Sequence, residues 1–337
     1  MVPALSAKTK YIVILADGMA DEPIEHLQNK TPLEYAYTPG MDELAMYSEI
    51  GRVRTVPDDM NPGSDVANMG LFGYNPEQWY SGRASLEASR LGLKWGHNAV
   101  AIRMNFVTIE GEGSFDEKRI LYYGAGGISD DDAWVLLNDL RQHFDGIPYT
   151  FHYGGGFHHI LMGNGCLQAT AAPPHDVIGK PISECLGDNE MLSDIMRRSH
   201  NYLSQHPVNI ALAANGKPMA NAIWLWGSGL RTQLPDFLEH NKLLGAAVTA
   251  TDVVGGIAKC ANMELVQLGA LDEATNYRDA AGAALKMILR KGYVFVYVHI
   301  ETPDDASHEG NMAAKISSIK NIDQSVLRAI RRGLDAR

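Results

Sequence analysis

The segments Tyr11–Ala16 (YIVILA) and Val294–Ile300 (VFVYVHI) decide the fold of this chain. Each is a continuous apolar run rich in β-branched residues, a pattern typical of a strand that is buried on both faces. Strand and helix patterns alternate near both ends of the chain. This alternation predicts a parallel sheet covered by helices on both faces, which is an α/β fold.

The middle of the chain shows a different order of secondary-structure patterns, in which helical patterns are separated by short strands and by loops rich in Gly and Pro. We therefore predict two domains: a discontinuous core made of residues 1–110 and 221–337, and a smaller inserted α+β domain at 111–220. The strand patterns at 99–109 and 222–226 fall inside the predicted core. A length of 337 residues agrees with two domains, because single cores seldom grow beyond about 250–300 residues.

The charge balance limits the possible partners. Lys and Arg number 29 against 40 Asp and Glu, which gives a formal net charge of −11. Such a surface repels nucleic acid and anionic membranes, so we expect neither as a partner. It would also repel a phosphorylated substrate unless cations in the site reverse the local field.

The cysteines and the first residues indicate a cytoplasmic protein. Cys166, Cys185 and Cys260 are scattered without CxxC spacing, which favours buried free thiols over disulfides or a thiolate zinc site. The sequence MVPALSAKTK lacks the apolar core of a signal peptide, and no apolar run approaches the roughly 20 residues that span a bilayer.

Two acidic motifs follow the two clearest strands. Asp17 comes directly after the first strand, and Asp304 and His308 lie four residues apart just after the second. Reactive groups in open α/β sheets gather beyond the carboxyl ends of the strands, and a carboxylate with an imidazole suits a divalent metal. Taken alone, Asp17 could equally serve a turn or a helix cap, and His308 could be a loop histidine.

Ser64 is a third candidate. It follows Pro62-Gly63 and opens a predicted helix that runs through Val66, Met69 and Leu71. The start of a helix favours negative charge, whether on an alkoxide or on a phosphate, and a metal near Asp17 would activate the hydroxyl as a nucleophile. The simpler interpretation is that Ser64 is only the N-cap of that helix.

Motifs spread in order over nearly the whole chain resemble the archaeal-type cofactor-independent phosphoglycerate mutases of the alkaline phosphatase superfamily. They include D-G-M-A-D (17–21), K-T-P-L-E (30–34), P-G-S-D-V-A-N (62–68), Y-x-G-R-x-x-L-E-A (80–88), R-M-N-F-V-T (103–108), P-P-H-D-V-I-G-K (173–180) and P-D-D-A-S-H-x-G (303–310). The N-terminal motifs also resemble a bacterial branch of the family that has been proposed to act as a homoserine kinase.

The resemblance implies an alkaline-phosphatase-like core with a site for two divalent ions, Mn²⁺ or Mg²⁺, with Zn²⁺ or Co²⁺ as further possibilities. Asp17 and Ser64 would bind one ion, and Asp304 and His308 the other. Ser64 would accept the phosphate of phosphoglycerate as a phosphoserine and return it to the other hydroxyl of the retained glycerate, so that 3-phosphoglycerate and 2-phosphoglycerate interconvert.

Five residues are candidates for contacts with a small phosphorylated metabolite. They are Arg83, Arg103, His159, His175 and Asp176. Guanidinium groups pair with carboxylate or phosphate through two hydrogen bonds, although structural salt bridges explain Arg83 and Arg103 equally well. His158 stands where the family more often has arginine, which leaves the identity of the substrate open.

A second departure lies at the end of the chain. The family continues with a further strand that carries an Asp-His pair and then another metal-binding histidine, whereas this sequence ends at Arg337. We expect the given chain to be incomplete. Two alternatives to a mutase stay open: a related phosphohydrolase or phosphotransferase with another acceptor, such as homoserine, and a non-catalytic metabolite-binding relative. The oligomeric state is not indicated by the sequence.

Overall fold

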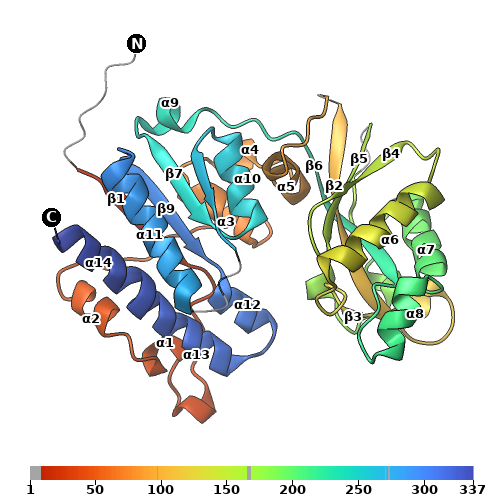
Figure 1. Ribbon diagram of the computed structural model, residues 1–337, viewed down its shortest axis with the longest axis horizontal. Helices are drawn as coiled ribbons and strands as arrows, with labels where there is room; N and C mark the ends of the chain where they lie inside the picture. Colours follow the sequence, from red (N-terminus) through yellow and green to blue (C-terminus); the bar gives the residue numbers. More distant parts are fainter. Residues whose placement is uncertain (1–8, 97, 165–167, 270, 272–273, 337) are drawn as a thin grey trace. The chain divides into compact units, whose positions relative to one another are not determined.

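The two apolar runs become neighbouring parallel strands of one sheet. The computed structural model describes residues 9–96, 98–164, 168–269, 271 and 274–336. The sheet has four strands in the order β1-β9-β7-β8, and all of its pairings are parallel (Figure 1). Its strands are β1 (Tyr11–Ala16), β7 (Gly245–Thr249), β8 (Glu264–Gln267) and β9 (Phe295–Ile300). The predicted α/β fold with a parallel sheet is confirmed.

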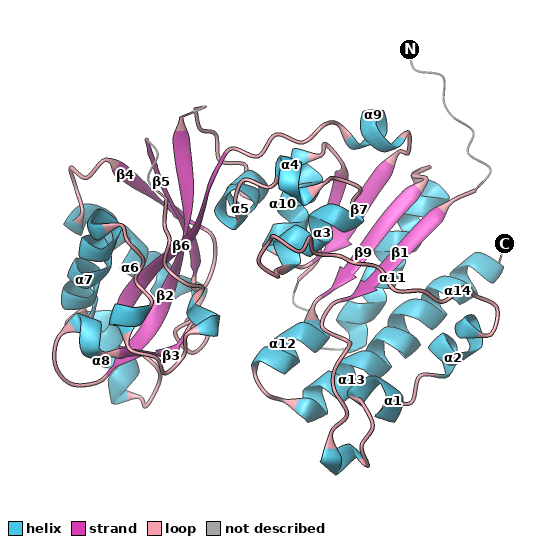
Figure 2. Cartoon of the chain, turned by 180° about the vertical axis from the view of Figure 1, so that it is seen from behind, coloured by secondary structure: helices cyan, strands magenta, loops and turns pink. Residues whose placement is uncertain are grey.

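Helices cover both faces of this sheet. Alternate residues of β9 point to opposite faces, so Val296 and Val298 join the core beneath α11 (Ala274–Arg290), whereas Tyr297 points the other way. On that second face lie α3 (Ser64–Leu71) and α10 (Asp252–Cys260), as Figure 2 shows from behind.

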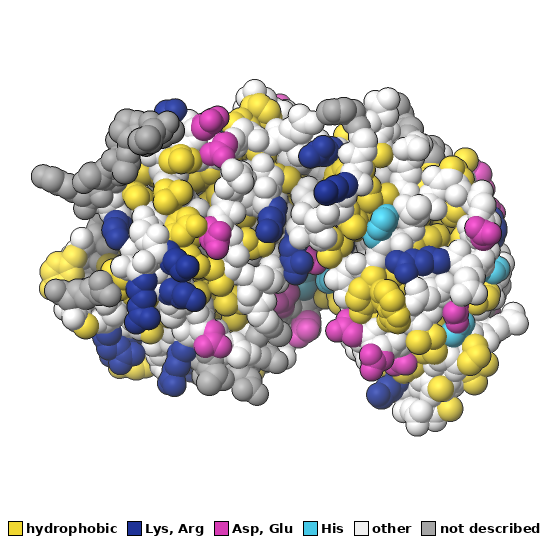
Figure 3. Space-filling view, turned by 45° about the horizontal axis from the view of Figure 1, so that its top comes forward, with side chains coloured by type: hydrophobic (Ala, Val, Ile, Leu, Met, Phe, Trp, Pro, Cys, Tyr) yellow, Lys and Arg dark blue, Asp and Glu magenta, His cyan; other side chains and the backbone are white. Residues whose placement is uncertain are grey.

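The remaining helices of this part of the chain are short, apart from the C-terminal series. They are η1 (Glu25–Leu27), α1 (Pro32–Tyr35), α2 (Pro39–Ala45), α4 (Pro76–Trp79), α9 (Phe237–Asn241), α12 (Thr302–His308), α13 (Met312–Asn321), the π-helix η5 (Ile322–Leu327) and α14 (Arg328–Asp335). Figure 3 shows Lys and Arg side chains gathering on the core side of the molecule although the net charge is negative. Arg278, Arg328 and Arg332 line a surface groove of about 640 Å³.

One expectation about β1 is wrong. The apolar run predicts a strand buried on both faces, but β1 lies at the edge of the four-stranded sheet, with Tyr11 48% exposed and the other residues of the strand partly buried. A run of apolar residues indicates that a strand packs against other parts of the protein. It does not indicate whether the strand has a hydrogen-bonded neighbour on each side within the sheet.

The second unit is built on an antiparallel sheet. Its strands are β2 (Ala99–Glu110), β3 (Arg119–Tyr122), β4 (Tyr149–Tyr153), β5 (His158–Asn164) and β6 (Ala222–Leu230), in the order β3-β2-β5-β4 with β6 paired to β2. Its helices are α5 (Arg83–Arg90), η2 (Phe115–Glu117), α6 (Asp130–His143), η3 (Pro174–Asp176), η4 (Ile182–Glu184), α7 (Glu190–Leu203) and α8 (Pro207–Ala214).

The boundaries between the two units differ from the predicted ones. The chain divides into a core unit, Met1–Trp79 with Gln233–Arg337, and an insert unit, Tyr80–Thr232. The predicted insert at 111–220 was too short, because it left β2 and β6 in the core. These two strands pair with each other along most of their length, and β2 also pairs with β5, so all three belong to one sheet.

Two other expectations concern the cysteines and the membrane. Cys185 is a buried free thiol, Cys260 is partly buried, and Cys166 lies outside the described residues. Among the residues that the structure describes, none of the helices has the length and apolar character needed to cross a bilayer.

Candidate active site

The candidate site lies at the carboxyl edge of the parallel sheet. Asp17 directly follows β1, and its backbone N–H donates to the carbonyl of Ile300 at the end of β9 (2.9 Å). Thr249 ends β7, between β8 and β9, and α12 begins two residues after β9. Because parallel strands end at the same edge, groups that are far apart in sequence meet there.

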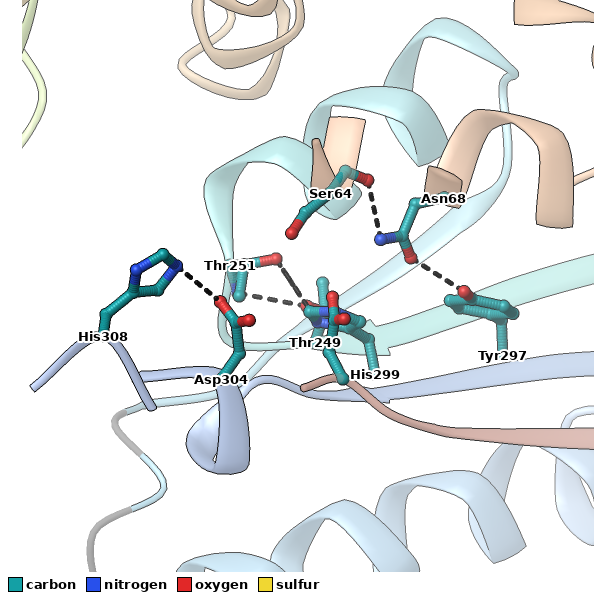
Figure 4. Close-up of polar contacts among 9 residues, drawn as sticks. Ser64, Asn68, Thr249, Thr251, Tyr297, His299, Asp304 and His308 are labelled. Carbon is teal, nitrogen blue, oxygen red and sulfur yellow. Dashed lines mark hydrogen bonds and ion pairs between the residues drawn. The ribbon is translucent and has the colours of Figure 1, made fainter. Parts of the chain in front are cut away.

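Ser64 is held above this edge by the first turn of α3. Its backbone carbonyl accepts a hydrogen bond from the Asn68 side-chain amide (2.8 Å), and Asn68 in turn accepts from the Tyr297 hydroxyl of β9 (2.7 Å; Figure 4). Burial raises the pKa of Tyr297, and the charge of Asp17 raises it further, so this hydroxyl keeps its proton. The first turn of α3 is therefore tied to the sheet by buried side chains.

The simpler interpretation of Ser64 as an N-cap is not what the structure shows. Gly63 is the N-cap residue, and Ser64 is the first residue of the helix, with no side-chain capping bond at this end. The Ser64 hydroxyl instead lies close enough to Asp17 to lower the pKa of that carboxylate. The side chain thus lies beside an acidic group at the end of a strand and takes no part in capping its own helix.

The loop after Asp17 lies directly against α12. Gly18 has φ +69°, and a Cβ atom built on it would lie 2.3 Å from the Cα of Asp304. Only glycine allows both this left-handed conformation and so close an approach of two backbones. The start of α12 is held by a hydrogen bond between the hydroxyls of Tyr277 and Thr302 (2.6 Å). These contacts place Asp304 beside Asp17.

The carboxylate of Asp17 is kept ionised by its neighbours. Burial by itself raises the pKa of Asp17, but the hydrogen bond and charge of His299, with the Gly18 N–H and the Ser64 hydroxyl, outweigh it, and the net pKa is lowered. The Nε2 atom of His299 lies 3.2 Å from Oδ2 of Asp17.

Asp304 and His308 form the second pair. The Nε2 atom of His308 lies 3.4 Å from Oδ2 of Asp304 across one turn of α12, and the imidazole is 48% exposed. Burial raises the pKa of Asp304; the charge of His308 opposes this shift, and the like charge of Asp17 adds to it. Figure 4 shows Ser64, His299 and Asp304 around a common space, with His308 beyond Asp304.

The side-chain atoms at this edge are of the kinds that coordinate a divalent cation, but they lie in pairs and do not form a complete coordination shell. Two carboxylates whose charges repel each other, a hydroxyl and an imidazole are ligands that Mn²⁺, Mg²⁺ or Zn²⁺ accept, and a cation would relieve the repulsion. Within the ranges that the structure describes, however, no group of three or more His, Cys, Asp or Glu side chains is arranged to hold a metal ion.

The five candidate substrate residues all lie on the insert unit. Arg83 donates to Glu87 (3.0 Å), and the guanidinium of Arg103 also contacts Glu87. Both guanidinium carbons lie over the ring of Trp226, at 5.5 and 4.8 Å from its centroid, and the ring of His175 meets the same indole at 5.5 Å. The structure thus gathers Arg83, Arg103 and His175 around Trp226, whose side chain is buried.

His159 and Asp176 do not share this arrangement. His159 is 1% exposed, and its ring packs against Phe106 and Tyr153, so the structure places it in the interior of the insert unit. Asp176 is exposed beside His175, with 3.8 Å between Oδ1 and the imidazole Nε2. His158 lies near both arginines; burial lowers its pKa well below the usual value, and the charges of Arg103 and Arg83 lower it further.

Three residues near Asp17 were missed by the sequence reasoning. His299 was counted as part of an apolar strand, although a polar residue at the end of such a run is itself a signal. Thr249 was taken only as the end of a strand. Lys315 of α13 is buried, and its ammonium donates to Asp21 (2.6 Å) and to the carbonyl of Ala20 (3.2 Å), which fixes the loop that begins at Asp17.

Comparison with solved structures places this architecture among known proteins. A Pyrococcus horikoshii protein of known structure superposes with a TM-score of 0.71 at 26% identity, covering 97% of this chain and 78% of that one. A cofactor-independent phosphoglycerate mutase from Thermoplasma acidophilum superposes with a TM-score of 0.50 at 25% identity, covering 96% of this chain and 83% of that one.

Sequence comparison then gives the family. Residues 45–209 match the family of 2,3-bisphosphoglycerate-independent phosphoglycerate mutases. The enzyme of that name from Methanothrix thermoacetophila is 39% identical over 334 residues, covering 97% of this chain and 82% of the relative. The one from Methanosarcina barkeri is 38% identical over 330 residues, covering 95% and 80%. The chain belongs to the 2,3-bisphosphoglycerate-independent phosphoglycerate mutase family.

Proposed function

We propose that this protein interconverts 3-phosphoglycerate and 2-phosphoglycerate by passing the phosphoryl group through Ser64. The observation that carries the proposal is the Ser64 hydroxyl, which lies beside an ionised carboxylate at the sheet edge of a chain from the mutase family. A mutase needs a group that holds the phosphoryl while the glycerate reorients, and a serine hydroxyl can do so.

The chain's own groups prepare Ser64 for this role. Asp17 offers an ionised carboxylate close to the hydroxyl. The position of Ser64 at the start of α3 puts developing negative charge on its oxygen near the positive end of a helix. In the first half-reaction the oxygen forms a bond to phosphorus as the bond to the glycerate oxygen breaks. In the second, the other glycerate hydroxyl attacks and the serine oxygen leaves.

We further propose that Asp17 with Ser64, and Asp304 with His308, hold two divalent ions, with Mn²⁺ or Mg²⁺ ahead of Zn²⁺ or Co²⁺. Such ions would lower the proton affinity of the hydroxyl and neutralise the charge of the transferring phosphoryl group. The positive charge of these ions would also attract an anionic substrate to a protein whose net charge is negative. On the insert unit, Arg83, Arg103 and His175, with Asp176 beside them, offer groups that bind carboxylate or phosphate.

The test of the nucleophile is the Ser64→Ala variant with Ser48→Ala as its matched control, because Ser48 is an exposed serine of the same unit that bonds only to the Leu44 carbonyl. Ser64→Ala should lose 2-phosphoglycerate formation by about three orders of magnitude or more, as when a nucleophile is removed from other enzymes. Mass spectrometry of the quenched wild type should find the phosphoryl group on the Ser64 peptide. A fully active Ser64→Ala protein would remove this residue from the reaction.

The products decide between the mutase and its alternatives. Release of inorganic phosphate, or transfer to homoserine from a phosphoryl donor, without 2-phosphoglycerate would show a related enzyme with a different acceptor. Binding of phosphoglycerate with no turnover and no phosphoserine would show a non-catalytic relative. Exhaustive chelation should abolish turnover and added Mn²⁺ should restore it; activity that survives chelation would refute the two-ion proposal.

A further inference from the structure

His299 lies wholly inside the protein, one residue before the end of β9, with 1% of its surface exposed. A buried imidazole needs partners for both ring nitrogens, because an unpaired polar group in the interior costs roughly 1–3 kcal/mol. Both nitrogens of His299 have such partners, and they come from two different strands and the loops that follow them.

The Nδ1 side of the ring faces hydroxyl groups. The Oγ1 of Thr249 lies 3.3 Å from Nδ1 and that of Thr251 lies 3.5 Å away (Figure 4). Thr249 accepts a hydrogen bond from the Thr251 backbone N–H (3.0 Å), and its own hydroxyl proton can be donated to Nδ1 or to the Thr251 hydroxyl at 3.2 Å. A threonine hydroxyl can therefore donate to Nδ1, and this side of the ring accommodates an Nδ1 that accepts and carries no proton.

The Nε2 side faces the carboxylate of Asp17, at 3.2 Å from Oδ2. A nitrogen lone pair directed at a carboxylate oxygen would be repulsive, whereas an N–H donates a charge-assisted hydrogen bond. The contacts of Nδ1 and of Nε2 therefore fit the same neutral tautomer, which carries its proton on Nε2.

We propose that His299 is a positioning residue for the reaction at Ser64: Thr249 fixes the ring as the Nε2–H tautomer, and that N–H holds the Asp17 carboxylate turned toward the Ser64 hydroxyl. Oδ2 of Asp17 is engaged by His299, and the Gly18 N–H and the Ser64 hydroxyl lie close enough to the same carboxylate to lower its pKa. The series Thr249, His299, Asp17 and Ser64 thus links the ends of β7, β9 and β1 to the start of α3. Its catalytic part rests on the proposed function; its structural part does not.

The structural part is tested by ¹⁵N-¹H correlation spectra of the full chain labelled at histidine, which separate the two neutral tautomers and the imidazolium. The signal is assigned by its loss in His299→Gln. We expect the Nε2–H pattern in the wild type and in Thr249→Ser, which keeps the hydroxyl, and a mixture of tautomers in Thr249→Val. An Nδ1–H or fully protonated ring in the wild type would overturn the proposal, whatever reaction the enzyme catalyses.

The catalytic part is tested by comparing His299→Leu with His299→Gln. Leucine removes the donor to Asp17, and kcat should fall about 10- to 100-fold, the range typical for groups that orient a ligand or nucleophile partner, with little change in KM. Glutamine fills a similar volume and places an amide N–H near Asp17, so it should recover part of the lost kcat. A folded His299→Leu protein with wild-type kcat, or a glutamine variant no better than leucine, would contradict the positioning role.

The two possible failures are distinguishable. If wild-type protein forms no 2-phosphoglycerate and no phosphoserine, the proposed function fails while the tautomer measurement still stands. If wild-type protein is active but His299 carries its proton on Nδ1, the function stands and the positioning role fails. Should His299→Leu not fold, Thr249→Val compared with Thr249→Ser supplies the same kinetic contrast, and an equal kcat in the two would refute the role.

Discussion

The Lys315–Asp21 pair fixes the loop that carries Asp17, and the two partners are buried to different degrees. The Lys315 side chain is 4% exposed, whereas that of Asp21 is 35% exposed. Removing the carboxylate leaves a buried ammonium that has lost its ionic partner; removing the lysine leaves a carboxylate that water can reach. We therefore expect Asp21→Asn to destabilise the protein more than Lys315→Met does.

The expected magnitudes follow from these exposures. Asp21→Asn should lower the free energy of unfolding by about 2–3 kcal/mol, below the 3–5 kcal/mol of a fully buried pair because Asp21 is partly solvated. Lys315→Met keeps an apolar stem of similar length and should cost about 1 kcal/mol or less. The double variant should resemble Lys315→Met, which gives a favourable coupling of roughly 2–3 kcal/mol between the two side chains.

Urea unfolding followed by circular dichroism at pH 7 measures these values, with Glu22→Gln as the control because Glu22 is an exposed neighbour. The hydrogen bond from Lys315 lowers the pKa of Asp21. The stability from this pair is therefore present above the unfolded pKa, near 3.9, and is lost as pH falls through the lower folded pKa. A larger cost for Lys315→Met than for Asp21→Asn would refute the reasoning.

Three further variants test other parts of the structure. Gly18→Ala should lower the free energy of unfolding by at least about 2 kcal/mol and abolish turnover, because a Cβ cannot fit against the Asp304 backbone. Thermal unfolding and the mutase assay measure these effects, and a stable and active alanine variant would disprove the contact. Asp323 is buried and accepts hydrogen bonds from the N–H groups of Gly40 (3.2 Å) and Met41 (2.6 Å) in the first turn of α2. Asp323→Ala should therefore destabilise the core unit by about 3 kcal/mol and increase hydrogen exchange in α2. Unchanged exchange would argue that these hydrogen bonds do not hold the start of the helix. Glu87→Gln should destabilise the insert unit by about 2–4 kcal/mol and change the fluorescence of Trp226, because two guanidinium groups lose their shared carboxylate; an unchanged melting temperature would show that the pair contributes nothing.

Local patterns were sufficient for the elements and for part of the site. The β-branched runs predicted β1 and β9, and the pattern that follows Pro62-Gly63 predicted the helix α3, because both depend on neighbours within a few residues. Asp304 and His308 could be paired from their spacing alone, since residues four apart lie on one face of a helix.

The tertiary structure decided which distant segments meet. The strand patterns at β2 and β6 do not reveal that these strands pair with each other, and this pairing moved both into the insert unit. Likewise, the sequence offers Ser64, Thr249 and His299 as a helix start, a strand end and a residue of an apolar run. They surround Asp17 only because parallel pairing brings the carboxyl ends of β1, β7 and β9 to one edge. The secondary-structure propensity of a residue depends on its neighbours in the sequence, whereas the order of the strands depends on burial across the whole chain. The site depends on the order of the strands.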